Sequence, residues 1–196
     1  MNIIDLDDLP SDMRDQFRAL IAENEALKRR VQKLATDAAH DELTGLANRR
    51  GFLKLLDKAL AFSKRYRIPA CLVFIDLNDF KQINDTHGHN VGDLVLTTIA
   101  KRIARQVRSS DIVARLGGDE FVVLFWQVSE EVARSRSGLL MHAICRDEIV
   151  VADDLSLIVR ASAGVAVMHP GDSADTLLER ADRAMYEKKS EIKKAG

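Results

Sequence analysis

The sequence predicts an α+β fold, in which strands and helices form one domain behind a long N-terminal helix. Three observations support this class. Apolar residues recur with heptad spacing up to residue 38, a continuous apolar run covers Cys71–Ile75, and two β-rich runs flank the turn Gly117-Gly118. The first pattern is typical of a coiled coil, the second of a strand buried on both faces, and the third of a β-hairpin.

The heptad segment steps alternately by four and three residues through Met13, Phe17, Leu20, Asn24, Leu27, Val31, Leu34 and Ala38. With Phe17 at an a position, Val31 also falls at a and the leucines fall at d, which favours two parallel strands. Asn24 then falls at a, where a buried asparagine weakens the coil but fixes its register. The pattern therefore predicts a dimerising helix. A single amphipathic helix packed on its own domain is the alternative.

The first elements of the domain follow this helix. Asn48 is the expected N-cap of a helix over residues 49–64. The apolar run Cys71–Ile75 is the expected central strand. A short helix follows, which we expect Asn78 to cap and Gly88 to end.

The remaining pattern predicts a helix with apolar residues at four-residue spacing from Val91 to Val107, strands over 112–116 and 121–126, a helix over 130–146, a strand over 157–168 and a helix over 173–189. A polar loop over 147–154 interrupts the domain. Between residues 71 and 168 the order is strand, helix, strand, strand, helix, strand. This is the ferredoxin-like (βαββαβ) order.

Composition limits the function classes. A net charge of −1 with 46% hydrophobic residues gives no bulk signal for nucleic acid or a membrane. The apolar runs are too short to span a bilayer, and no basic-then-apolar leader opens the chain. Cys71 and Cys145 lie in apolar runs without metal-ligand spacing, so we expect buried free thiols. A cytoplasmic protein without membrane or nucleic-acid partners is predicted.

Three carboxylates mark the predicted site. Asp76 ends the central strand, and Asp119 and Glu120 follow the hairpin glycines. If neighbouring strands bring them together, their repulsion favours a hard cation such as Mg²⁺, which keeps coordination positions for phosphates. Gly117 and Gly118 let backbone N–H groups approach a ligand closely. This predicts phosphoryl or nucleotidyl transfer, with a polar hairpin facing water as the alternative.

The string RLGGDEF, over residues 115–121, resembles the signature of the GGDEF family of diguanylate cyclases. Three more blocks are similar to that family in order and spacing: DELTGLANRR from Asp41, FIDLNDFKQINDTHGHNVGD over 74–93 and ADRAMYEKK from Ala181. The resemblance implies a palm of the nucleotidyl cyclase type with extra helices. It also implies that two GTP molecules are condensed into cyclic di-GMP and two pyrophosphates. We expect an acidic segment over 1–12, a coiled coil over 13–40 and a catalytic domain over 41–196.

By this resemblance, Asp76, Asp119 and the backbone carbonyl of Leu77 bind Mg²⁺, with Mn²⁺ as a second candidate. Glu120 completes the acidic cluster as a ligand or as the group that helps deprotonate the attacking ribose 3′-hydroxyl. Lys81 stabilises charge on the transferring phosphate.

The resemblance also implies a guanine site. The amide of Asn84 and the carboxylate of Asp93 match the donors and acceptors of guanine and disfavour adenine. A carboxylate satisfied within a turn is the alternative role of Asp93. His89 is a candidate nucleotide contact, or else a core or capping histidine. The main chain near Phe80 and the turn glycines would hold phosphates.

Two lysines near the C-terminus complete the implied substrate site. Lys189 matches the family's phosphate-binding lysine on the last helix. The family's usual Gly-Arg-Asn ending is replaced by Ile192-Lys193-Lys194, so Lys193 stands where an arginine that binds the triphosphate is expected. A lysine keeps the charge but loses the bidentate fork, which predicts looser GTP binding.

Arg108 and Asp111 form an RxxD arrangement that resembles the family's inhibitory product site. The resemblance implies that Arg108 stacks on guanine and that Asp111 accepts a hydrogen bond from the base. A polar helix end with an aspartate capping the next strand is the alternative. Arg134 and Arg136 are the candidates for the second arginine of such a site.

Two reciprocal attacks between two bound GTP molecules require two domains related by a two-fold axis. The coiled coil would hold them as a homodimer that is basally active or controlled by an unknown regulatory protein. Two alternatives remain: a catalytically weak module that binds GTP or cyclic di-GMP as a sensor, and a docking adaptor.

Overall fold

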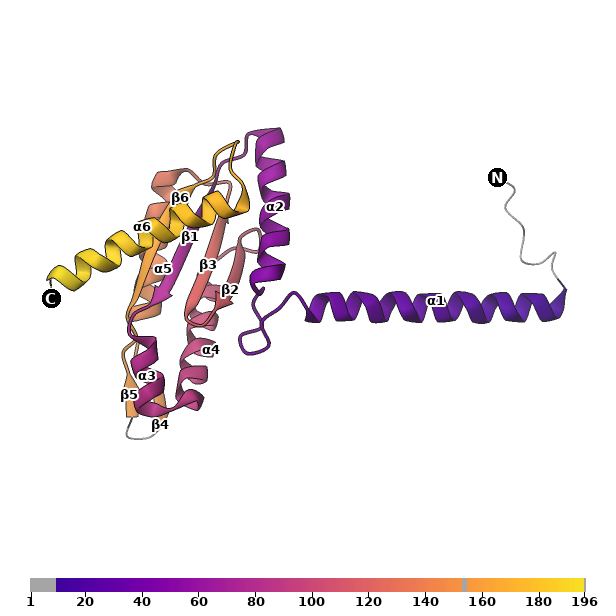
Figure 1. Ribbon diagram of the computed structural model, residues 1–196, viewed down its shortest axis with the longest axis horizontal. Helices are drawn as coiled ribbons and strands as arrows, with labels where there is room; N and C mark the ends of the chain where they lie inside the picture. The colour runs from indigo at the N-terminus through magenta and orange to yellow at the C-terminus, as the bar shows by residue number, and fades with distance from the viewer. Residues whose placement is uncertain (1–9, 153–154, 196) are drawn as a thin grey trace. The chain divides into compact units, whose positions relative to one another are not determined.

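The computed structural model describes residues 10–152 and 155–195, with side chains described there except at 11–12, 31–37 and 192–195. The chain divides into two compact units, Met1–Ala38 and Ala39–Gly196. Figure 1 shows helix α1 in the first unit and a sheet with its covering helices in the second.

Helix α1 (Ser11–Asp37) confirms the long N-terminal helix that the heptad spacing predicts. Its seam positions Phe17, Leu20 and Leu27 are exposed in the single chain. An exposed apolar stripe of this spacing suits pairing with another helix. The dimer itself stays a prediction. Two further seam positions have side chains outside the described residues: Val31 and Leu34.

The second unit is built on a four-stranded sheet of order β2-β3-β1-β6. Its strands are β1 (Ala70–Leu77), β2 (Ile112–Gly117), β3 (Glu120–Trp126) and β6 (Ala161–Val167). Each neighbouring pair is antiparallel. With helices after the first and third of these strands, the ferredoxin-like order is confirmed.

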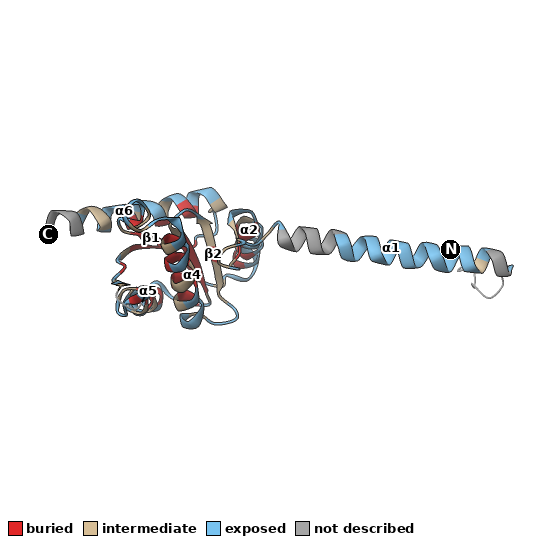
Figure 2. Cartoon of the chain, turned by 90° about the horizontal axis from the view of Figure 1, so that it is seen from below, coloured by how far each residue is buried: buried red, intermediate tan, exposed pale blue. Residues whose placement is uncertain are grey.

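Helices cover both faces of the sheet because side chains alternate along each strand. Cys71, Val73 and Ile75 face a core formed with α4 (His89–Gln106) and α5 (Glu130–Cys145). Leu72 and Phe74 face a second core formed with α2 (Arg49–Tyr66) and α6 (Ala174–Ala195). Figure 2 shows the buried residues gathered between these layers. Strand β1 is therefore buried on both faces, as its continuous apolar run predicts.

The helix caps are only partly as predicted. Asn48 caps α2 as expected, with its side-chain oxygen accepting a hydrogen bond from the Gly51 N–H. Helix α3 (Phe80–His87) ends at Gly88, also as expected. The prediction that Asn78 caps α3 is wrong, because Asp79 is the cap residue and makes no side-chain capping bond. The Asn78 side chain instead accepts a hydrogen bond from the Ser162 hydroxyl on β6.

The strand predicted over 157–168 is confirmed as β6, but it begins later than predicted, at Ala161. Strand β4 (Ile149–Ala152) lies inside the stretch 147–154 that was predicted to be a polar loop, and it pairs with β5 (Leu155–Leu157), which follows that stretch. Arg102 on α4 explains where this hairpin starts. Its guanidinium donates to the carbonyls of Ile144 and Glu148, at 2.7 and 3.0 Å, and so ties the end of α5 to the hairpin.

Two expectations from composition can be compared with the fold. Cys71 is a buried free thiol, and burial raises its pKa to about 11; Cys145 is free but only partly buried. Among the helices that the structure describes, none is long and apolar enough to cross a membrane.

Candidate active site

The sheet brings the three predicted carboxylates to one edge. Asp76, near the end of β1, lies directly opposite Glu120 at the start of β3. The Leu77 N–H donates to the Asp119 carbonyl at 3.3 Å, which fixes the hairpin turn against the end of β1. Residues 42 or more positions apart in the chain are therefore held together by backbone register, as the sequence predicts.

The electrostatics of this edge are unfavourable for two of the carboxylates. Burial raises the pKa of Asp119 above its ordinary value, and the negative charge of Asp76 adds to this effect. Burial likewise raises the pKa of Glu120, with further contributions from the charges of Asp119, Asp182 and Asp76. A cation at this edge would relieve the repulsion.

Lys189 supplies one positive charge at the site. Its ammonium on α6 forms a short ion pair with the carboxylate of Asp76, and both side chains are mostly buried. The structure thus pairs Lys189, which the resemblance predicts to bind phosphate, with Asp76, which it predicts to bind the metal. Lys193, the other predicted C-terminal contact, has a side chain outside the described residues.

The oxygen donors at this edge suit a hard divalent cation. Carboxylates of Asp76, Asp119 and Glu120, with the carbonyl of Leu77, are the oxygen ligands that Mg²⁺ prefers. Over residues 10–152 and 155–195, however, no group of three or more Asp, Glu, His or Cys side chains is arranged to hold a metal. The donors fit an open site that shares its cation with phosphate oxygens, and they do not form a closed protein cage.

The predicted guanine readers come from two adjacent helices. Asn84 lies on α3 and is half-buried, whereas Asp93 lies on α4 and is exposed. The backbone of Gly92 makes room for Asn84: a Cβ at Gly92 would lie 1.9 Å from the Asn84 side-chain oxygen. Any larger residue at position 92 would displace Asn84. No sequence pattern singles out Gly92, because its role depends on how α3 packs on α4.

The other predicted substrate residues differ in what they present. Phe80 is buried in the core with α4, so only its main chain can meet a ligand. Lys81 and His89 are exposed at the starts of α3 and α4. Lys81 forms no ion pair within the described ranges, so its charge is free for an anion.

The glycine turn is held from behind by Arg115. Gly117 and Gly118 adopt φ values of 156° and 49°, a region that favours glycine, and no atom lies within 4 Å of a Cβ built on either. Arg115 donates from Nε and Nη2 to the Gly118 carbonyl at 2.9 and 2.8 Å. The open side of the turn is therefore free for a ligand, while its other side is anchored.

Asp41 completes this anchor and was not predicted as a site residue. Its carboxylate accepts from Arg115 Nη1 at 3.1 and 3.2 Å, and from the N–H and hydroxyl of Thr44 at 2.9 and 2.6 Å. Burial opposes ionisation, but these donors outweigh it and lower the pKa of Asp41. The signal was present, because both residues lie in the blocks DELTG and RLGGDEF. Their pairing across 74 positions required the fold.

The RxxD turn is organised around a buried aspartate. The side chain of Asp111 is 0% exposed and accepts from the Arg108 N–H at 2.9 Å, the Trp126 N–H at 3.1 Å and Arg136 Nη2 at 2.6 Å. Burial opposes its ionisation, but these donors lower its pKa. Arg136 also lies over the Phe125 ring at 4.0 Å, whereas Arg134 pairs with Glu130. Of the two candidates, Arg136 belongs to this turn.

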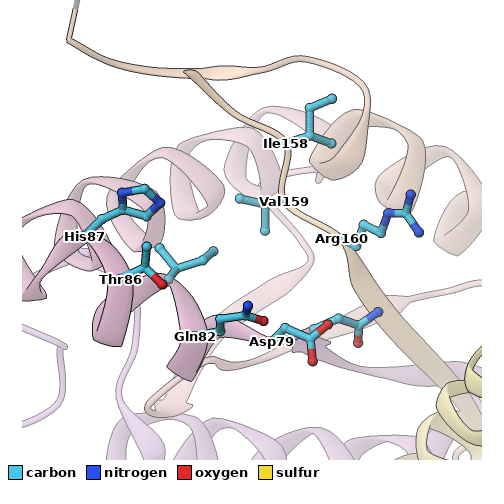
Figure 3. Close-up of a pocket in the computed structure, with 9 residues that line it drawn as sticks. Asp79, Gln82, Thr86, His87, Ile158, Val159 and Arg160 are labelled. Atoms are coloured by element: carbon cyan, nitrogen blue, oxygen red, sulfur yellow. The ribbon is translucent and has the colours of Figure 1, made fainter. Parts of the chain in front are cut away.

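A polar cavity of about 300 Å³ lies between α3 and the segment that precedes β6. Figure 3 shows Gln82, Thr86 and His87 on its α3 side, facing Val159 and Arg160 from the segment before β6. No side chain predicted from the sequence to bind GTP lines this cavity.

The comparisons with known proteins agree with this geometry. A family model described as "Diguanylate cyclase, GGDEF domain" matches residues 38–195. The diguanylate cyclase TpbB of Pseudomonas aeruginosa is 39% identical over 182 residues, which is 90% of this chain and 42% of TpbB. The diguanylate cyclase DosC of Escherichia coli K12 is 32% identical over 74% of this chain and 32% of its own length. The chain thus spans less than half the length of these curated relatives.

Two solved structures are similar over nearly the whole chain. The coiled coil and GGDEF domain of DgcB from Caulobacter crescentus, in complex with c-di-GMP, has a TM-score of 0.83 at 30% identity, covering 92% of this chain and 95% of that one. SiaD from Pseudomonas aeruginosa, in complex with its activator SiaC, has a TM-score of 0.76 at 31% identity, covering 91% and 69%. The matching family model, the antiparallel palm and the glycine turn beside Asp76 lead to one conclusion: this chain belongs to the GGDEF family of diguanylate cyclase domains.

Proposed function

We propose that this chain is a diguanylate cyclase that condenses two GTP molecules into cyclic di-GMP and two pyrophosphates. One observation carries the proposal. Asp76 lies opposite Glu120 in the sheet, beside a glycine turn whose outer side is open. Acidic oxygens and accessible backbone N–H groups therefore lie at the same edge of the sheet. These are the groups that bind a divalent cation and the phosphates of a triphosphate.

The metal of this reaction would be Mg²⁺, with Mn²⁺ as a second candidate. Asp76, the Leu77 carbonyl and Asp119 would hold it. When bound, such an ion acts as a Lewis acid toward the phosphate. Glu120 would join as a ligand or accept the proton of the 3′-hydroxyl.

Binding and selectivity rest on residues around this centre. Lys81 has no ion-pair partner in the described ranges, and Lys189 lies beside Asp76, a proposed metal ligand. Both lysines can therefore neutralise phosphate charge. Asn84 and Asp93 would read guanine. A site built on such hydrogen bonds rejects adenine because its own polar groups would be left unpaired.

Two domains have to meet for cyclisation, and α1 is the proposed tether. Its exposed apolar seam is what a parallel two-stranded coil needs, and it would convert the encounter of two domains into an intramolecular one at effective concentrations on the order of millimolar. We place the coil over 13–40 and the catalytic domain over 41–196. SiaD binds an activator protein. By analogy, a regulatory protein acting on this cyclase forms part of the proposal.

Product inhibition through the RxxD turn is proposed with divided roles. Arg108 is exposed and can stack on guanine and bind phosphate. Asp111 is buried with its oxygens engaged, so we assign it the positioning of Arg108 through the Arg108 N–H. DgcB binds c-di-GMP, which supports cyclic di-GMP as the ligand here.

The test is chromatography of the products that the full chain forms from GTP and Mg²⁺. Cyclic di-GMP and pyrophosphate are expected, and Asp119→Ala should abolish them. Glu179→Ala, which removes an exposed carboxylate elsewhere on α6, is the matched control and should be as active as the parent. GTP binding without any turnover would overturn the cyclase proposal in favour of a sensor module.

A further inference from the structure

Strand β6 forms one edge of the four-stranded sheet and, among the strands that the structure describes, pairs only with β1. Its even-numbered residues make the bonds to β1. The Met168 N–H donates to the Ala70 carbonyl at 2.9 Å, just beyond one end of the strand. The Arg160 carbonyl accepts from the Asn78 N–H at 2.8 Å, just beyond the other end. In an antiparallel ladder, the odd-numbered residues of β6 therefore direct their N–H and carbonyl groups away from β1.

Two of these outward-facing residues have no backbone partner. At the ends of β6, the outward groups contact the side chains of Cys145 and Arg180. Between these ends, no hydrogen bond within the described ranges reaches the outward N–H and carbonyl groups of Ala163 and Val165. Both residues are buried, at 5% and 7% exposure. Backbone groups at such a depth are costly to leave unpaired, so this edge requires water or a ligand.

Two cavities lie along the open edge and meet at Val165. The first, of about 340 Å³, is lined in part by Ala163, Val165, Gly138, Met141 and Lys188. The second, of about 300 Å³, is lined in part by Val165, Val167, Arg180 and Arg183. Arg134 of α5 lines both. We refer to the two cavities together as the edge groove. Its walls are α5 and α6, which Figure 2 shows on opposite sides of β1.

The two walls of the edge groove differ in chemistry. On the α5 side, Met141 and the bare backbone of Gly138 leave apolar space beside Ala163. On the α6 side, Arg183 and Lys188 are exposed and form no ion pair in the part of the chain that the structure describes. The groove therefore offers apolar contact on one face of the sheet and positive charge on the other.

We propose that the edge groove binds an extended segment of a partner protein in which small apolar and acidic residues alternate. The backbone of such a segment would pair with Ala163 and Val165 and add a strand to the sheet. Successive side chains of a strand point to opposite faces. The apolar residues would therefore meet Met141, and the acidic residues would meet Arg183 and Lys188.

The unpaired backbone groups favour this occupant over the alternatives. A lipid surface has no row of donors and acceptors that matches a strand edge, and hydrocarbon would leave the groups of Ala163 and Val165 unpaired. A second copy paired through β6 would bring its own α5 and α6 into the layers that the first copy's helices already occupy. A two-fold contact would also set Arg183 and Lys188 near their own counterparts. A single extended segment avoids both conflicts.

Amide hydrogen exchange, measured by NMR on the full chain, follows this edge directly. The probe is a short synthetic peptide of alternating valine and glutamate with blocked ends. In the free chain, the amides of Ala163 and Val165 should exchange faster than those of Gly164 and Ala166, which face β1. Saturating peptide should slow exchange at Ala163 and Val165 by at least about tenfold and leave Gly164 and Ala166 unchanged.

Modified peptides separate backbone pairing from contact through side chains. One version is N-methylated at every valine and another at every glutamate. Because successive residues of a strand direct their N–H groups to opposite edges, at least one version should lose about tenfold or more in affinity. The anisotropy of a fluorescent peptide gives the affinity. A peptide with lysines in place of the glutamates should also bind at least about tenfold more weakly.

Variants of the chain localise the binding. Gly138→Leu should weaken the acidic peptide by about tenfold or more, because no atom lies within 4 Å of a Cβ built at Gly138 and the new side chain would fill the groove. Gly171→Leu, at another open glycine outside both cavities, is the matched control and should bind as the parent does.

Arg183→Glu provides a second, independent variant. It reverses an exposed charge on the α6 wall and should also weaken the acidic peptide by about tenfold or more. It keeps the test valid should Gly138→Leu unfold the domain, and urea unfolding of each variant checks the fold.

Four results would overturn the proposal. One is unchanged exchange at Ala163 and Val165 with saturating peptide, which would leave the groove to water. Another is equal affinity for the parent peptide and both N-methylated versions. Protection that rises with protein concentration in the absence of peptide would assign the edge to a second copy. Protection by phosphatidylglycerol vesicles but not by the peptide would assign it to a membrane. The binding results do not depend on whether the chain forms cyclic di-GMP.

Discussion

Two pairs of acidic side chains in this domain have pKa values shifted in opposite directions. Asp41 and Asp111 receive hydrogen bonds from arginines and backbone N–H groups, and their pKa values are lowered despite burial. Asp119 and Glu120 face other carboxylates, and burial and repulsion raise their pKa values. The first pair holds turns in place. The second pair comprises residues that we propose as metal ligands, whose repulsion a cation would relieve, and this difference would distinguish a functional carboxylate from a structural one.

The largest expected effect is a loss of enzymatic activity when a member of the second pair, Asp119 or Glu120, is changed. Asp119→Asn removes a proposed metal ligand and should lower cyclic di-GMP formation by about a thousandfold or more. Because the charge at Asp119 is unfavourable in the fold, resistance to urea should stay the same or rise. A variant that loses activity only through unfolding would contradict the contrast.

The next largest effect is a loss of folding stability when a member of the first pair, Asp41 or Asp111, is changed. Asp111→Ala leaves Arg136 without its partner and frees the Arg108 turn, which should cost about 2–3 kcal/mol of unfolding free energy. Urea titration measures this loss. Asp147→Ala breaks the exposed ion pair with Arg146 and should change nothing measurable. Equal losses in the two variants would show that burial of Asp111 does not matter.

A smaller effect tests the anchor behind the glycine turn. Asp41→Asn keeps the shape of the side chain but removes the charge that holds Arg115 against the Gly118 carbonyl. Turnover should fall by about tenfold, because the turn that faces the phosphates becomes less ordered. Steady-state kinetics with GTP provide the measurement. Glu42→Gln, a neighbouring exposed carboxylate, is the control and should keep full turnover.

The smallest effect is a pH dependence of opposite sign for the two pairs. For Asp41 and Asp111, whose pKa values are lowered, the stability contribution is complete above the ordinary aspartate value of 3.8 and is lost as pH falls through the folded pKa. For Glu120, whose pKa is raised above 4.5, the ionised form costs stability at neutral pH; this cost begins to fall as pH decreases through the folded pKa and is gone below the ordinary value of 4.5.

Glu120→Gln should therefore be more stable than the parent at neutral pH, and the difference should shrink as pH falls through the pKa of Glu120. Urea unfolding between about pH 4 and 7 gives this curve. An advantage that grows on acidification would reverse the sign and contradict the electrostatic account. Asp41→Asn, in contrast, should be destabilised at neutral pH and approach the parent in acid.

Much of the site was predictable because backbone register follows from local patterns. The apolar run at Cys71–Ile75 and the glycine turn predict β1 and the hairpin, and their antiparallel pairing then places Asp76 opposite Glu120. Local capping was less predictable: Asn78 has a typical cap side chain, but β6 offers it the hydroxyl of Ser162. Only the start of the strand predicted over 157–168 was wrong, because residue 157 pairs with β4 and the apolar side chain of Ile158 is exposed.

By itself, the sequence determined the family, the strand order, the N-terminal helix and the acidic edge, because each depends on residues that are neighbours in the chain or on hydrophobic period. Only the tertiary structure decided that Asp41 reaches Arg115, that Gly92 makes room for Asn84 and that Lys189 meets Asp76. These contacts join separate elements at distances of a few ångströms. The packing of helices, strands and loops against one another sets such distances, and no spacing along the chain records them.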